Sequence, residues 1–137
     1  MENSNLYFDI AATTPIDREV VQLINKINIE NFGNPSSIHS IGQKSHNIIE
    51  RSRLSISNIL NCKASEIIFT SGGSESNNIV LKGILSKGDH LITSAYEHPS
   101  ILNLAEQILD RGIEVTFIKP NKNGTIDKNK IESAIKQ

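Results

Sequence analysis

The sequence is poor in the residue types that build disulfide scaffolds, multi-thiolate zinc sites and membrane spans. Its 137 residues include one cysteine, Cys62, no tryptophan and only 4% aromatic residues. A single cysteine excludes an internal disulfide and fits a reducing compartment. No apolar run approaches the roughly 20 residues that cross a bilayer, and the N-terminus has no basic leader. We therefore expect a soluble, cytoplasmic protein without a membrane partner.

An excess of one charge is also missing. The chain has 14 Lys and Arg against 15 Asp and Glu, a formal net charge of -1, and these residues are scattered. Nucleic-acid binding normally needs a basic face that displaces counterions, so no nucleic-acid partner is expected. The histidines make no metal-ligand spacing with Cys62, so no metal site is expected either.

The apolar periodicity indicates alternating strands and helices. At this length the chain permits one sizeable core. We predict strands at 6–10, 67–69, 90–93 and 115–118. We predict helices from a Thr14 cap through Ile27, from Ile41 through Leu60, at 77–85, at 100–110, and from an Asp127 cap through Ile135.

The order from Ile67 onward is βαβαβ, which is typical of a parallel sheet with right-handed crossovers. The predicted class is therefore α/β, a mainly parallel sheet flanked by helices. Three strands make a narrow sheet with exposed edges, and the alternation predicts a further strand after Gln137. We expect the fold to be incomplete, as the first part of something larger.

The stretch FTSGGSESNN, residues 69–78, is a small-residue turn between a predicted strand and a predicted helix. Such a turn presents unpaired backbone N–H groups at the positive end of the helix dipole, which favours an anion such as phosphate. Gly72 and Gly73 permit close approach, and Ser74 adds a hydroxyl. The alternative is a capped helix with glycines fitted to a tight turn. Neither a Gly-Lys-Ser/Thr ending nor a G-x-G-x-x-G pattern is present.

The stretch AYEHPS, residues 95–100, also joins a predicted strand end to a helix start. It should therefore lie on the same rim of the sheet as Ser74. The imidazole of His98 is suited to stack on a planar heterocycle or to move a proton near it. The alternative is a helix cap or a solvated turn residue.

Four motifs occur in order along residues 6–137: YFDIAATTP, NFGNPSSIHSIGQ, EIIFTSGGSESNN and TSAYEHPSI. Together they resemble the N-terminal part of a cysteine desulfurase of the NifS/IscS type, within the class V aminotransferases. The resemblance implies the fold-type I architecture of pyridoxal-phosphate-dependent transferases and a homodimer. It implies conversion of L-cysteine to L-alanine with sulfur left as an enzyme persulfide, for iron–sulfur cluster or thio-cofactor biosynthesis, with a sulfur acceptor or scaffold protein as a further partner.

The resemblance also implies a division of the chain and a set of site residues. Residues 1–40 would form an N-terminal segment and helix belonging to a small-domain or linker part, and residues 41–137 the truncated first part of the large cofactor-binding domain. Gly73 and Ser74 match the pair that holds the cofactor phosphate, with Ser74 where the family often has threonine. His98 matches the histidine that stacks over the pyridine ring and assists proton transfers.

Other family residues are absent from this stretch. The lysine that forms the Schiff base, the aspartate at the pyridine nitrogen and the catalytic cysteine lie farther downstream than Gln137 in the family. Cys62 falls where the family carries no catalytic thiol. Asn34 and His39 receive no chemical role, and Gly33 to Ser37 is interpreted as a structural turn.

We therefore expect the chain alone to be inactive as a desulfurase. Two alternatives remain open. One is a non-catalytic fragment that binds a partner through an exposed sheet edge. The other is part of a different class V lyase, such as a selenocysteine lyase.

Overall fold

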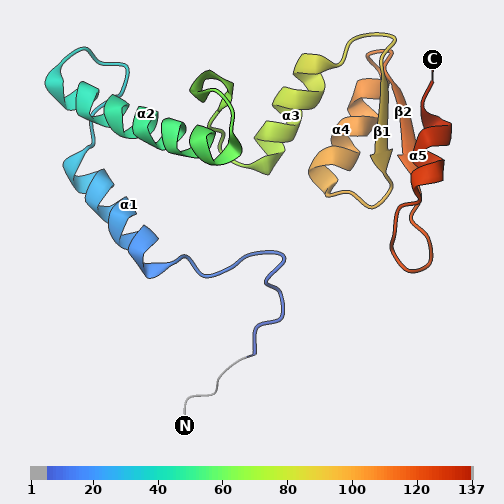
Figure 1. Ribbon diagram of the computed structural model, residues 1–137, viewed down its shortest axis with the longest axis horizontal. Coiled ribbons are helices and arrows are strands. Elements are labelled where there is room, and N and C mark those ends of the chain that lie inside the picture. The colour runs from blue at the N-terminus through green and yellow to red at the C-terminus, as the bar shows by residue number, and fades with distance from the viewer. Residues whose placement is uncertain (1–5, 137) are drawn as a thin grey trace. The chain divides into compact units, whose positions relative to one another are not determined.

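A computed structural model describes residues 6–136, and its chain divides into two compact units, one up to Ile68 and one from Phe69 onward (Figure 1). The predicted domain boundary after residue 40 stays a prediction. No helix within residues 6–136 is long and apolar enough to cross a membrane.

The first unit begins with helix α1, Arg18–Glu30. The side chain of Asp17 caps this helix by accepting a hydrogen bond from the Glu19 N–H at 2.8 Å. The predicted cap at Thr14 is wrong, because a carboxylate placed directly before the helical run satisfies an N-terminal N–H group that Thr14 is too far away to reach.

Helix α2, Ser40–Leu60, follows and is capped by His39, whose Nδ1 accepts from the Gly42 N–H at 3.3 Å. It ends at Asn61, which adopts the left-handed conformation with a φ of 53°. Asparagine is among the few non-glycine residues that tolerate this conformation. A short 3-10 helix, Ala64–Glu66, completes the unit.

The turn between α1 and α2 packs tightly on the start of α2. A Cβ atom added to Gly33 would lie 2.5 Å from the Ile41 carbonyl oxygen, and one added to Gly42 would lie 2.6 Å from the Asn34 carbonyl oxygen. The Asn34 side chain accepts a hydrogen bond from the Ser36 N–H at 2.9 Å. These contacts give the turn residues structural roles, as its composition indicated.

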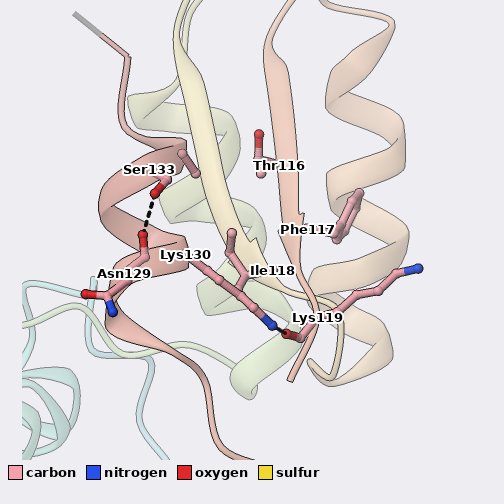
Figure 2. A pocket seen from close by; sticks show the side chains of 8 residues that line it. Thr116, Phe117, Ile118, Lys119, Asn129, Lys130 and Ser133 are labelled. Atoms are coloured by element: carbon pink, nitrogen blue, oxygen red, sulfur yellow. Dashed lines mark hydrogen bonds between the residues drawn. The ribbon is translucent and has the colours of Figure 1, made fainter. Parts of the chain in front are cut away.

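The second unit contains three helices and two strands. They are α3 (Gly73–Ile84), β1 (His90–Ser94), α4 (Pro99–Leu109), β2 (Glu114–Ile118) and α5 (Lys128–Ala134). The strands pair in parallel, with His90 opposite Glu114 and Ser94 opposite Ile118. The strand pair lies between α4 and α5 (Figures 1 and 2). The α/β class and the parallel pairing are confirmed.

Two predicted strands are not formed in the described chain. Residues 6–9 have no regular structure, and residues 67–70 lie outside any ladder although Ile67 has extended dihedral angles. Extended residues become a strand only by exchanging backbone hydrogen bonds with a neighbour, and the sheet within residues 6–136 consists of β1 and β2. The predicted three-stranded sheet is therefore wrong for this structure.

The core of the second unit lies where α4 meets the strands. Leu104, Ile108 and Ile113 form its buried centre. Partly buried Leu81, Leu85, Leu91 and Val115 pack against it, so α3 and both strands contribute. The apolar positions of α4 thus fix where its N-terminus lies relative to α3.

We expect the Ile108→Ala variant to lose about 2–5 kcal/mol of unfolding free energy, because Ile108 is fully buried and truncation leaves a cavity. The matched control is Leu109→Ala, since Leu109 is 48% exposed and should cost less than about 1 kcal/mol. Urea unfolding of the three proteins measures both values. Equal losses would contradict the placement of the core.

Candidate functional site

The N-terminus of α3 has no side-chain cap. Gly72 holds the cap position and has no side chain to accept from the first N–H groups, which in any helix lack intrahelical partners. The other α-helices of the described chain have capping side chains, from Asp17, His39, His98 and Asp127. The start of α3 therefore leaves backbone donors for something other than the chain's own cap.

Neither glycine of this turn is required by the fold itself. Gly72 has extended backbone with a φ of 162°, and Gly73 is helical. A Cβ atom added to either residue would meet nothing within 4 Å. The turn therefore has open space in front of its backbone, which would permit close approach of a ligand.

The hydroxyl groups of Thr70, Ser74 and Ser76 divide into two sets. Thr70 Oγ1 and Ser76 Oγ lie 2.8 Å apart, and each also lies within 3.3 Å of the Gly72 carbonyl oxygen, so they hold the turn in shape. The exposed Ser74 accepts from Asn78 through its backbone carbonyl at 2.9 Å. Its hydroxyl forms no hydrogen bond with other described residues and is available to a ligand.

Glu75 turns its carboxylate back to Ser71. Glu75 Oε2 accepts from the Ser71 N–H at 2.6 Å and from the Ser71 hydroxyl at 2.7 Å. These bonds stabilise the ionised form and lower the pKa of Glu75 below its ordinary value of 4.5, the backbone bond contributing most. The carboxylate thereby binds the N–H group of Ser71, which precedes Gly72, and does not bind the N–H groups at the start of α3.

His98 caps the N-terminus of α4. Its Nδ1 accepts from the Ser100 N–H at 3.1 Å and lies 2.8 Å from the Ser100 hydroxyl oxygen. Pro99 occupies the first helical position, where a missing N–H costs nothing. The structure thus shows the capping role that the sequence left as an alternative. Capping uses Nδ1 and leaves Nε2 uncommitted to other described residues.

One hydrogen bond joins the two helix starts. Asn77 Nδ2 donates to the Ser100 hydroxyl oxygen at 2.9 Å. The link between the α3 turn and His98 therefore runs through Asn77 and Ser100, and Ser74 and His98 form no hydrogen bond with each other. All these residues belong to the second unit.

Asn77 and Ser100 were not predicted from the sequence, although a signal for them exists. Asn77, Leu81 and Leu85 recur every four residues along α3 and its C-cap, as do Ser100, Leu104 and Ile108 on α4. Residues with this spacing share a helix face, and the two faces meet in the core. Each apolar face begins with a polar residue. This pattern predicts that the two polar residues pair where the contact between the helices begins.

Away from the two helix starts, a pocket of about 510 Å³ lies between β2 and α5 (Figure 2). It is lined by Thr116, Phe117, Ile118, Lys119, Asn129, Lys130, Ser133 and Ala134. The ammonium group of Lys130 donates to the Lys119 carbonyl at 3.3 Å and to Asn121 Oδ1 at 3.1 Å. The pocket contains no predicted site residue and no histidine, cysteine or carboxylate lines it. Within residues 6–136, no three such side chains gather as a metal site.

The comparisons with known proteins agree on one family. The aminotransferase class-V profile matches residues 6–137. The chain is 43% identical over 135 residues to cysteine desulfurase IscS 1 of Archaeoglobus fulgidus. The chain belongs to the aminotransferase class-V family.

Solved structures support the class V assignment and its fold. A structure described as SspA in complex with cysteine superposes with a TM-score of 0.86 at 38% identity, covering 95% of this chain. A NifS-like protein superposes with a TM-score of 0.87 at 28% identity, covering 96%. The predicted resemblance to cysteine desulfurases of class V is confirmed.

This class V chain spans only part of its relatives. The alignment with the Archaeoglobus fulgidus protein includes 96% of this chain but 35% of that protein. The two structural superpositions include 39% and 37% of the solved chains. The roles of Gly73, Ser74 and His98 remain proposals.

We expect the Ser71→Ala variant to raise the pKa of Glu75 toward 4.5 without reaching it, because the backbone donor remains. Ser71→Thr keeps the hydroxyl and should keep the lower pKa. A carbon-detected NMR titration of the Glu75 carboxyl group measures all three proteins. An identical pKa in wild type and Ser71→Ala would contradict the role of the hydroxyl.

The lowered pKa of Glu75 determines how the free energy of unfolding changes with pH. The stabilisation from ionised Glu75 is fully present above pH 4.5 and is lost as the pH falls through the lower folded-state pKa. Glu75→Gln should remove that part of the pH dependence, as urea unfolding between pH 7 and pH 3 would show.

Proposed function

We propose that this chain is part of a pyridoxal-phosphate-dependent cysteine desulfurase and that the start of α3 holds the cofactor phosphate. The observation that carries the proposal is the glycine-capped N-terminus of α3 with the uncommitted Ser74 hydroxyl. Family membership supports it, since class V aminotransferases depend on this cofactor and several relatives are cysteine desulfurases.

The donors at this turn fit a phosphate group. The N–H groups of Gly73, Ser74 and Glu75 lie at the positive end of the α3 dipole, and the Ser74 hydroxyl adds a side-chain donor. Glu75 would repel a phosphate if its carboxylate faced the same donors. The hydrogen bonds from Ser71 hold that carboxylate back, which makes the turn compatible with an anion.

His98 is suited to contact the cofactor ring. The hydrogen bonds at Nδ1 orient the imidazole, and Nε2 is the nitrogen that can meet a ligand. Bound pyridoxal phosphate supplies an electron sink for chemistry at the α-carbon of an amino acid. In the proposed site Gly73 and Ser74 bind the phosphate, while His98 stacks on the ring and moves a proton at Nε2.

The reaction of the whole enzyme is proposed from its relatives. L-Cysteine would be the substrate, with L-alanine and an enzyme persulfide as products, in a homodimer that passes sulfur to an acceptor or scaffold protein. The persulfide needs a nucleophilic thiolate. Cys62, the single cysteine of the 137 residues, is half-buried in the turn after α2, where its N–H donates to the Ser57 carbonyl at 3.0 Å. We assign Cys62 a structural role.

We expect pyridoxine phosphate, which has no aldehyde to react with lysines, to shift the amide NMR signals of residues 72–76. Pyridoxine without phosphate should not. Ser74→Ala should weaken binding about tenfold, because a hydrogen bond to a charged group is lost. Ser74→Thr, which keeps the hydroxyl, is the matched control and should bind within about twofold of wild type. Amide signals that shift equally with pyridoxine would contradict a phosphate site here. So would pyridoxine phosphate shifts that leave residues 72–76 unchanged and affect only other residues.

We expect the 137-residue chain mixed with L-cysteine and pyridoxal phosphate to form no more alanine or persulfide than the same mixture without the protein. The physical reason is that the family's lysine and catalytic thiol are not among its residues. Amino-acid analysis and a persulfide-specific alkylation assay measure the two products. Stoichiometric alanine and persulfide that depend on the chain would overturn the expected inactivity.

A further inference from the structure

The hydrogen bonds around His98 have a direction. A backbone N–H can only donate, so the Ser100 N–H at 3.1 Å requires a lone pair on His98 Nδ1. The neutral imidazole carries one proton, which must then lie on Nε2. The capping geometry therefore selects the Nε2–H tautomer.

The side chains of Ser100 and Asn77 continue the same direction. The Asn77 amide nitrogen donates to the Ser100 hydroxyl oxygen at 2.9 Å, which leaves the hydroxyl proton to point toward His98 Nδ1 at 2.8 Å. Each donor in the sequence Asn77, Ser100, His98 points toward the ring. Hydrogen bonds arranged in such a chain strengthen one another.

The packing of α3 against α4 holds this chain in place. Asn77 and Ser100 are half-buried and begin the helix faces that continue into the core through Leu81 and Leu104. The ring itself is exposed, so without these bonds it would rotate freely in solvent. The packing of α3 on α4 thus fixes the orientation of the exposed His98 side chain through Asn77 and Ser100.

We propose that Asn77 and Ser100 are positioning residues that fix the orientation of His98 and its Nε2–H tautomer. The inference rests on the proposed function for its catalytic meaning, since it presents Nε2–H to the ligand that His98 would contact. It also couples the ring to the turn that would hold the phosphate, because Asn77 lies one helical turn after Gly73.

The test measures the tautomer of His98 in the ligand-free chain. The spectra are recorded at about pH 8.5, where free histidine is neutral. Long-range proton–nitrogen correlation spectra then give the ratio of Nε2–H to Nδ1–H, with His98→Gln identifying the signals. Wild type should be predominantly Nε2–H.

Three variants separate positioning from mere packing. Ser100→Ala removes one donor to Nδ1 and should lower the Nε2–H to Nδ1–H ratio about fivefold, the equivalent of one net hydrogen bond. Ser100→Thr keeps the hydroxyl and should restore the ratio. Asn77→Asp offers only acceptors, draws the Ser100 proton away from the ring and should lower the ratio at least as much.

His39 is the matched control. It also caps a helix through Nδ1, accepting from the Gly42 N–H, and it belongs to the first unit. Its tautomer ratio should stay unchanged in all three variants. Should Asn77→Asp fail to fold, the Ser100→Ala and Ser100→Thr pair decides by itself.

Predominant Nδ1–H in wild type, or an unchanged His98 ratio in Ser100→Ala, would overturn the inference. Because no ligand is added, this failure is distinct from failure of the proposed function, which the pyridoxine phosphate titration detects. A change shared by His39 would also overturn the inference, because it would mean a general disturbance.

Discussion

The backbone N–H groups at a helix start must find acceptors, and how each helix meets this requirement organises the candidate site. Asp17 and Asp127 cap α1 and α5 with carboxylates, and His39 and His98 cap α2 and α4 with imidazoles. Only α3, among the α-helices of residues 6–136, begins at a glycine without a capping side chain. The same physical requirement thus accounts for the ordinary helix starts and marks the exceptional one.

The two halves of the candidate site depend on the core of the second unit. Leu104 and Ile108 bury one face of α4, and Leu81 packs against them from α3. This contact brings Asn77 within hydrogen-bonding distance of Ser100. Core packing therefore positions both parts of the candidate site, since displacing either helix would separate the α3 turn from the His98 cap.

Capping and catalysis are compatible roles for His98. The imidazole has two nitrogen atoms, and the helix cap uses Nδ1 alone. The sequence presented a cap and a functional histidine as alternatives; the geometry shows the cap, which leaves Nε2 open to the proposed role. An imidazole held at one nitrogen is oriented for contact at the other, as in many sites where a hydrogen bond fixes the tautomer.

The sequence by itself determined the local structure and the family. Helix periodicity, the small-residue turn at 69–78 and the motif around His98 are short-range patterns, and their physical causes act within a few residues. The tertiary structure decided what needs distant partners. Residues 67–69 have the apolar composition of a strand yet lie outside the sheet of the described chain, because a ladder requires a neighbouring strand. The bond between Asn77 and Ser100 likewise arises only when two helix faces, 23 residues apart in the chain, pack together.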